Sequence, residues 1–242
     1  MLTIIRIAMV ACVFMWAPAI TSIAQTENTN EPVSFGERTQ LGSIQPAFIN
    51  EASGLAASRR YPGMYWVHND NGRHPGLFLI DAAGRLQATV QLAGASFQDW
   101  EDLAAVTLNG QHHLIVADCG DNSLRRDSCR LFVLSEPERE LEQEAVIEAT
   151  ISDVETLSFR YPDGARDCES VAVDNTGTVF LLTKQHAPEH PRAAWYTLTL
   201  NPQNPHEVQT ANRLESGFDE PLVTGMDFAP NGRWCVVRSY GT

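Results

Sequence analysis

Short apolar runs bounded by glycine, proline, asparagine and acidic residues recur along the chain, and this pattern predicts strands. Four stretches share one arrangement, in which acidic residues precede a small apolar run; they are 51–58, 98–105, 167–174 and, most loosely, 224–230. Each leads into a second apolar run that ends in a polar or charged residue, namely 64–70, 113–118, 179–184 and 234–238. A repeat of about fifty residues built from short strands is typical of a β-propeller, in which each repeat forms one blade.

The alternation of apolar and polar positions predicts an all-β chain with four-stranded antiparallel blades. Strands of the first blade are expected at 53–58, 64–68, 77–80 and 86–92, and those of the second at 103–108, 113–117, 130–134, 145–151 and 157–161. Strands of the third are expected from 170, at 179–183 and at 195–200, and the fourth blade is a two-stranded hairpin from 223 to 237. The Asn109-Gly110 pair between two of these runs is the strongest local hairpin signal.

About three and a half blades do not close a ring, so we expect the sequence to be a fragment. A six-bladed propeller would need roughly a hundred residues more. The alternative is a four-bladed ring in which a strand expected within 37–49 completes the sheet of the last hairpin. The charged segment 136–144 lacks an apolar stripe wide enough to pack, so we expect it to be an exposed insertion between outer strands.

The amino terminus predicts export. Arg6 precedes an apolar run at 7–20, and the small residues at 22–24 resemble a cleavage site, so residues 1–24 are predicted to be a signal peptide. Residues 25–36 are predicted to be a flexible lead-in and 37–242 the propeller domain. We expect a periplasmic or secreted protein with no membrane span after signal removal.

Charge narrows the choice of partners. The formal net charge is −13, and no cluster of Lys and Arg is evident, which argues against nucleic acid as a ligand. An acidic surface suits cations, although acidity alone also keeps an exported protein soluble.

Four cysteines remain after signal removal, an even number for an oxidising compartment. Cys119 and Cys129 bracket a polar loop, and we expect a disulfide between them, although four cysteines allow three pairings and sequence does not decide. Zinc is the rival explanation, but no CxxC pair supports it.

Acidic residues recur where the innermost strands would begin, so a propeller would bring them together at one rim of its channel. The predicted metal ligands are Glu51, Asp99, Glu101, Asp118, Asp167 and Glu169. Converging carboxylates repel one another unless a cation neutralises them, and Ca²⁺ or another hard divalent cation takes six to eight such oxygens. The equally weighted alternative is structural: the acids accept hydrogen bonds from backbone amides of neighbouring blades and hold the ring together.

Other polar residues at strand ends extend the predicted site. Asp70, Lys184 and Arg238 occupy related places in different blades and are predicted to bind a ligand, with salt bridges to the acids as the alternative. His68 lies beside Asp70 and is the candidate general base, although a lone histidine at a strand end is more often structural.

The motifs at 51–56, 66–70, 99–104 and 167–172 resemble those of a group of secreted bacterial β-propeller proteins of uncharacterised activity. They are more distantly similar to SdiA-regulated, NHL-type and gluconolactonase or senescence-marker propellers. In the lactonase branch, channel-facing acids hold a divalent cation that polarises an ester carbonyl; the resemblance implies that role for Glu51, Asp99, Glu101 and Glu169. Two functions are therefore expected: a metal-dependent hydrolase of small esters, lactones or phosphate esters, or a non-catalytic envelope or extracellular protein that binds a protein or saccharide ligand.

Overall fold

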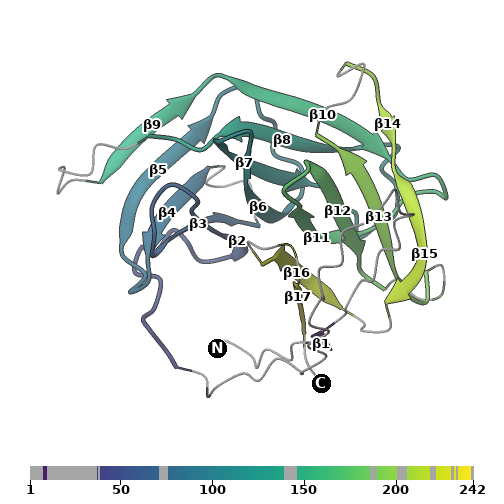
Figure 1. Cartoon of the computed structure of the whole chain (residues 1–242), viewed down its shortest axis with the longest axis horizontal. Helices are drawn as coiled ribbons and strands as arrows, with labels where there is room; N and C mark the ends of the chain where they lie inside the picture. Colours follow the sequence, from purple (N-terminus) through teal and green to yellow (C-terminus); the bar gives the residue numbers. More distant parts are fainter. Residues whose placement is uncertain are drawn as a thin grey trace, which may run out of the picture.

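The computed structural model describes residues 8–9, 37, 39–70, 76–138, 146–185, 188, 190–200, 206–218, 222–229, 232 and 234–240. These residues form strands and connecting segments, arranged as four sheets that fan around a common centre (Figure 1). None of the described segments is a helix long and apolar enough to cross a membrane. The predicted all-β propeller architecture is therefore confirmed.

Each sheet runs outward from an inner strand, and most of its neighbouring strands are antiparallel. The first contains β2 (Ala52–Ala57), β3 (Met64–Asn69), β4 (Leu77–Asp81), β5 (Leu86–Leu92) and β9 (Ile147–Ile151). The second contains β6 (Trp100–Leu108), β7 (Gln111–Asp118), β8 (Cys129–Ser135), β10 (Val154–Arg160) and β14 (Gln209–Thr210). The third contains β11 (Cys168–Val173), β12 (Thr178–Thr183), β13 (Ala193–Thr199) and β15 (Asn212–Phe218), and the fourth contains β16 (Val223–Phe228), β17 (Cys235–Ser239) and β1 (Ala8–Met9).

The hairpins follow the local signals in the sequence. Asn109 and Gly110 both have positive φ, 50° and 79°, which is the backbone that a two-residue β-hairpin requires. Aspartate and glycine supply the turn between β4 and β5, where Gly84 has a φ of 80° and donates its N–H to the carbonyl of Asp81. These turns fix the register and hence which side chains each strand buries.

Two parallel pairings, which the sequence did not predict, protect the outer edges. The strand expected at 145–151 forms as β9, but it joins the first sheet rather than the second. After β8 the chain returns to the outer edge of the first sheet, where β9 pairs in parallel with β5, and only then forms β10. In the same way β14 pairs in parallel with β10 before the chain forms β15. The resulting outer belt is visible in Figure 1. It covers sheet edges that would otherwise expose unpaired backbone groups.

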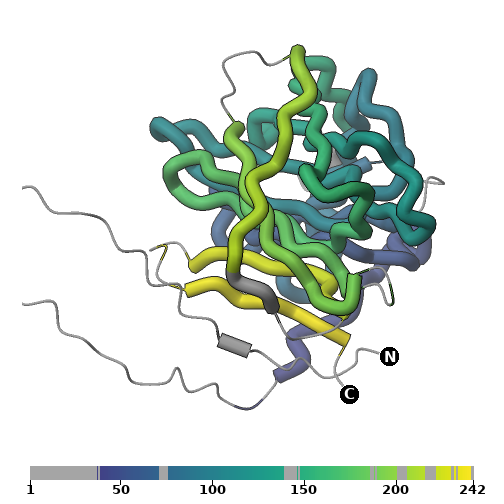
Figure 2. Tube along the Cα trace, turned by 90° about the vertical axis from the view of Figure 1, so that its right-hand side faces the viewer, coloured from purple at the N-terminus to yellow at the C-terminus, as the bar shows by residue number. Residues whose placement is uncertain are grey.

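The hydrophobic core lies between neighbouring sheets, because each sheet presents apolar side chains from both faces. The first and second sheets enclose Trp66, Leu79, Trp100, Leu114 and Phe132. The second and third enclose Leu131, Phe159, Val171, Leu181 and Tyr196. The third and fourth enclose Ala172, Trp195, Val223, Met226 and Val237, and Figure 2 shows the final hairpin, in yellow, beside the third sheet.

Residues 39–50 do not form the strand that was predicted within 37–49. Instead, Ile49 is buried against Val67, Phe78 and Ile80, on the face of the first sheet that points away from the second. Phe48 adds a ring contact with Phe78, at 5.5 Å between centroids. The segment therefore covers an apolar face of the first sheet and removes it from water.

The predicted signal peptide lies almost wholly outside the described residues, and the lead-in at 25–36 lies outside them altogether. Of the first 24 residues the structure describes Ala8–Met9 alone, which pairs antiparallel with Val236 and Val237 of β17. Export therefore stays a prediction.

The segment 136–144 was predicted to be an exposed insertion, and this prediction is wrong for Glu136. Residues 139–144 lie outside the described residues. Its carboxylate is buried and joins the first two sheets. It accepts hydrogen bonds from Trp66 Nε1 at 2.8 Å, from the backbone N–H groups of Arg59 and Arg60 at 3.1 Å, and from the Ser58 hydroxyl. This role of Glu136 was not predictable from sequence, because its partners lie about seventy residues away along the chain.

The predicted disulfide is not formed, and Cys119, Cys129, Cys168 and Cys235 are free thiols. Cys129 Sγ lies 3.9 Å from the carbonyl oxygen of Cys119, and Cys119 Sγ lies 3.2 Å from the carbonyl oxygen of Cys168. The sulfurs thus approach backbone oxygens within the core between the second and third sheets. Burial raises the pKa of Cys129 to about 12, which keeps its thiol neutral.

One buried carboxylate joins three sheets at the centre. Asp102 of β6 accepts hydrogen bonds from the backbone N–H groups of Leu103 at 2.9 Å, Val171 of β11 at 2.8 Å and Met226 of β16 at 3.4 Å. Small residues occupy the matching positions of the other three inner strands, namely Gly54, Ser170 and Gly225. One side chain therefore fills a space to which four strands contribute.

Asp102→Ala tests this arrangement. The substitution leaves the N–H groups of Val171 and Met226 buried without an acceptor, so we expect the free energy of unfolding to fall by about 3 kcal/mol. Asp102→Asn keeps one acceptor oxygen and should lose less. Urea unfolding of both variants measures the effect, and an Asp102→Ala protein as stable as the wild type would contradict it.

Candidate metal centre

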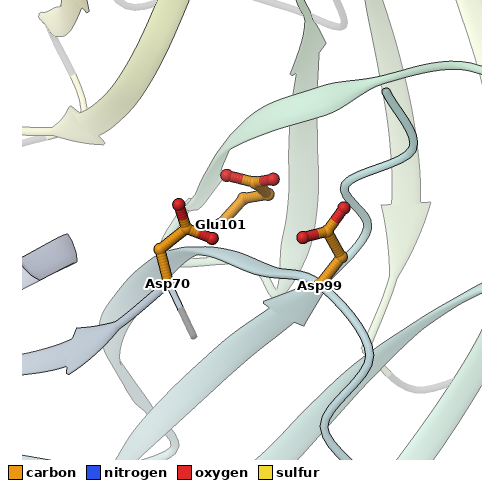
Figure 3. A group of neighbouring side chains, drawn as sticks. All are labelled: Asp70, Asp99 and Glu101. Atoms are coloured by element: carbon orange, nitrogen blue, oxygen red, sulfur yellow. The ribbon is translucent and has the colours of Figure 1, made fainter. Parts of the chain in front are cut away.

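Five carboxylates meet where the inner strands of the first three sheets begin. Asp70, Asp99 and Glu101 each place a carboxylate oxygen within 4.8 Å of the others, and Glu101, Asp167 and Glu169 do the same. Glu101 belongs to both groups. Figure 3 shows the side chains of the first group directed toward one another, with Asp70 following β3, Asp99 preceding β6 and Glu101 on β6.

β-Bulges explain why these glutamates leave the regular alternation of their strands. The pairing of β6 with β7 shifts between Trp100 and Asp102, and that of β11 with β12 shifts between Cys168 and Ser170. Glu101 and Glu169 are the residues skipped by the ladder, and a bulge re-aims such a side chain. Glu101 therefore points to the carboxylates while the next residue, Asp102, points to the centre.

Backbone contacts hold the carboxylates in place. The Ser53 hydroxyl donates to the carbonyl of Glu101 at 2.7 Å, which ties the bulge to the first sheet. The N–H of Asp121 donates to Asp167 Oδ1 at 2.8 Å, which ties the loop after β7 to the start of β11.

Gly120 makes room for the group. A Cβ at this position would collide with Oε1 of Glu101 and with the carboxylate of Asp99. Any larger residue would therefore push the two acids away from the backbone of this loop.

Of the five acids, Glu101 is the one whose ionised form is most disfavoured by its surroundings. Burial, together with the charges of Glu169 and Asp99, raises its pKa to about 9. The pKa values of Asp70 and Asp99 are also raised, first by burial and then by neighbouring carboxylates. Without a counter-ion, the folded protein therefore keeps Glu101 protonated at neutral pH.

Lys184 is the lysine at this site and the only one in the sequence. Its Nζ binds the carboxylate of Glu169 and lies 3.8 Å from Asp167 Oδ2. Burial alone would lower its pKa, but the hydrogen bond and charge of Glu169 raise it, so Lys184 is an ammonium group. The ammonium group of Lys184 therefore faces several acidic groups, and the charge of Arg126 also acts on Asp99.

Asp167 has one oxygen without a hydrogen-bond donor. Its side chain is fully buried, and Oδ1 accepts from Asp121, but Oδ2 has no hydrogen-bond partner among the described residues. Oδ2 faces Lys184 at a distance too long for a hydrogen bond. A buried carboxylate oxygen normally has a hydrogen-bond partner, so Oδ2 of Asp167 is an exception among the described residues.

Asp118 does not join the carboxylates, in contrast to its predicted role as a metal ligand. It is buried and bound by two arginines, with Oδ1 3.0 Å from Arg126 Nη1 and Oδ2 2.5 Å from Arg130 Nη2. Oδ1 also accepts from the N–H of Asp99 at 3.0 Å. Asp118 therefore positions Asp99 rather than an ion.

Glu51 and Arg238 are not members of the two carboxylate groups, although the carbonyl of Glu51 accepts the N–H of Asp70 at 2.8 Å. Glu51 is exposed and raises the pKa of Asp70 through its charge, after the larger effect of burial. Arg238 is on β17, where it donates to the hydroxyl and the carbonyl of Thr224 at 2.9 and 3.0 Å. Of the three predicted ligand-binding residues, Asp70 and Lys184 therefore reach the carboxylates.

His68 is fully buried, which separates it from any ligand in solvent. Its Nδ1 lies 3.0 Å from the carbonyl of Asn69, and its ring packs edge-on against Trp100 at 5.7 Å. Burial lowers its pKa to about 4, so the ring is neutral. A general base must reach the proton that it removes, and we therefore do not assign His68 this role.

Sequence reasoning missed Asp102 and Gly120. Asp102 could have been found by aligning the four inner strands, because its position holds Gly, Asp, Ser and Gly in turn. Gly120 gave no such signal, since its importance comes from side chains of another strand.

No protein-family model matches the sequence, and no curated protein matches it. Among solved structures, the chain is similar to one titled "Structure of Dos1 propeller", with a TM-score of 0.33 and 10% sequence identity. The similarity covers 75% of this chain and 50% of that one, so this chain spans about half the length of that structure.

Glu101→Gln tests the electrostatic strain in the absence of divalent cations. The pKa of Glu101 is about 9 in the folded protein and near 4.5 in the unfolded chain, so the folded state binds the proton of Glu101 more tightly. The stability that this proton contributes is complete below about pH 4.5 and is lost as pH rises to about 9. Glutamine does not titrate. We expect the variant to lose less stability than the wild type between pH 5 and pH 9.

Urea unfolding in a chelator across that range is the measurement, with the exposed Glu148→Gln as the matched control. Identical pH profiles for Glu101→Gln and the wild type would contradict the assignment.

Proposed function

We propose that this protein is an exported β-propeller that binds a hard divalent cation, Ca²⁺ foremost, through Asp70, Asp99, Glu101, Asp167 and Glu169. The observation that carries the proposal is the buried Asp167 Oδ2, which lacks a hydrogen-bond partner among the described residues within a group of converging carboxylates. A cation would supply the missing partner and neutralise the repulsion that raises the pKa of Glu101.

The donor set favours Ca²⁺ over a transition metal. All five side chains offer carboxylate oxygens, which suit Ca²⁺, Mg²⁺ or Mn²⁺, whereas Zn²⁺ prefers sulfur and nitrogen. Extracellular calcium modules work at dissociation constants of about 10⁻⁴ to 10⁻³ M, so an exported protein does not need a tight site.

The reaction we propose is hydrolysis of small esters, lactones or phosphate esters. The ion would act as a Lewis acid on the carbonyl or phosphoryl oxygen and lower the pKa of a bound water. Asp70 is the exposed member of the group, so it is the carboxylate that a water from solvent can reach and the one suited to accept its proton.

A second candidate is a non-catalytic envelope or extracellular protein that binds a protein or saccharide ligand through the same ion. The burial of His68 favours it, since it removes the candidate base that the sequence suggested. Turnover of an ester, lactone or phosphate-ester panel by the Ca²⁺-loaded protein separates the two candidates.

Calorimetric titration tests cation binding. We expect one Ca²⁺ per chain, with release of protons at pH 7 because Glu101 must ionise. Repeating the titration in buffers of different ionisation enthalpy measures the proton count. Asp167→Asn should abolish binding, whereas Asp174→Asn, in the β11–β12 turn, should leave it unchanged. Absence of Ca²⁺, Mg²⁺ and Mn²⁺ binding would refute the proposal.

Lys184→Met tests whether the ammonium group of Lys184 competes with Ca²⁺ for the carboxylates. Removing the only positive charge that binds Glu169 should tighten Ca²⁺ binding roughly tenfold. The same change should lower the free energy of unfolding of the metal-free protein by about 2 kcal/mol, because Glu169 loses a charge-assisted hydrogen bond. Weaker Ca²⁺ binding by the variant would show that Lys184 supports the site rather than competes with the ion.

A further inference from the structure

A cavity of about 430 Å³ adjoins the carboxylates. Asp99 and Gly120 form the wall that it shares with the proposed cation site. The rest of its lining comes from Gln98 and from further residues of the loop between β7 and β8, whose side chains carry hydroxyl, amide and guanidinium groups. These include Asn122, Ser123, Arg125 and Ser128.

Arg125 supplies positive charge to this cavity. Its side chain is exposed and makes no ion pair with a described residue, in contrast to Arg126, which binds Asp118 and the carbonyl of Gly120. The acidic residues of the same loop differ in how far they can neutralise the charge of Arg125. Asp121 is buried and accepts the backbone N–H groups of Arg125 and Arg126, which leaves Asp127 as the exposed acid among the residues that line the cavity.

The loop is fixed directly to the carboxylate group. Asp121 donates its N–H to Asp167 Oδ1 at 2.8 Å, and its Oδ1 accepts the N–H of Arg125 at 3.0 Å. Arg125 is therefore two hydrogen bonds from the buried carboxylate that carries the cation proposal. Leu124, between these residues, has a φ of 51°, a strained conformation that the surrounding hydrogen bonds maintain.

We propose that this cavity binds a small oxyanion, a carboxylate or a phosphate, that bridges the divalent cation and the guanidinium group of Arg125. The proposal rests on the proposed cation site, because Asp99 would otherwise repel an anion from the shared wall. Arginine matches both oxyanions through its fork of N–H donors. The chemistry narrows the ligand or substrate class to acidic molecules, such as hydroxy-acid esters or phosphate monoesters.

Three probes of similar size separate charge from shape: phenyl phosphate, benzoate and the neutral benzamide. We expect the two anions to bind only when Ca²⁺ is saturating, and benzamide to bind at least tenfold more weakly than benzoate. Tighter binding of phenyl phosphate would identify the ligand as a phosphate ester, and tighter binding of benzoate would identify it as a carboxylate.

Arg125→Ala should weaken anion binding about tenfold while leaving Ca²⁺ binding intact, since the backbone N–H that holds the loop remains. Arg125→Lys should restore part of the affinity. Arg85→Ala is the control, because Arg85 pairs with Asp81 in the β4–β5 turn and does not line the cavity. Equal binding of benzoate and benzamide, or no effect of Arg125→Ala, would overturn the anion site alone. A failure of Ca²⁺ itself to bind would instead overturn the cation site on which it rests.

Discussion

Three of the four sheets are held around one centre by the buried side chain of Asp102. It accepts backbone N–H groups from β6, β11 and β16, so the strands must approach it closely. Gly54, Ser170 and Gly225 leave the space that it fills. Because the ladder of β6 shifts at Glu101, the side chain of Glu101 turns toward the other carboxylates while that of Asp102 points to the centre. The hydrogen bonds of the structural alternative are made by Asp102 and also by Asp167, which accepts the backbone N–H of Asp121 from the loop after β7 in the second sheet.

That arrangement makes the rim electrostatically unfavourable in the absence of a cation. Two overlapping carboxylate groups share Glu101, and Lys184 is the ammonium group that faces them. The adjoining cavity is also lined by Arg125, whose backbone is fixed through Asp121 to the same Asp167. Asp99 and Arg125 therefore line one cavity, as a ligand held jointly by a cation and an arginine would require.

The periodic features were predictable from sequence, while features that depend on distant contacts were not. Acidic residues that precede small apolar runs correctly indicated where the inner strands lie. In the structure, four residues of these stretches belong to the two carboxylate groups, namely Asp99, Glu101, Asp167 and Glu169. The role of Asp118 was wrong because two arginines from the following loop and strand occupy its oxygens. Residues 39–50 look like a strand, yet Ile49 covers an apolar face instead. The outer belt escaped notice because parallel pairing joins segments tens of residues apart.

The most direct test is a crystal structure of the protein grown with Mn²⁺, with anomalous scattering used to locate the ion. The account predicts one peak coordinated by oxygens of Glu101 and Asp167, with Lys184 displaced from Glu169. A peak elsewhere, or none at saturating Mn²⁺ with Lys184 still bound to Glu169, would contradict the claim that these carboxylates form a cation site.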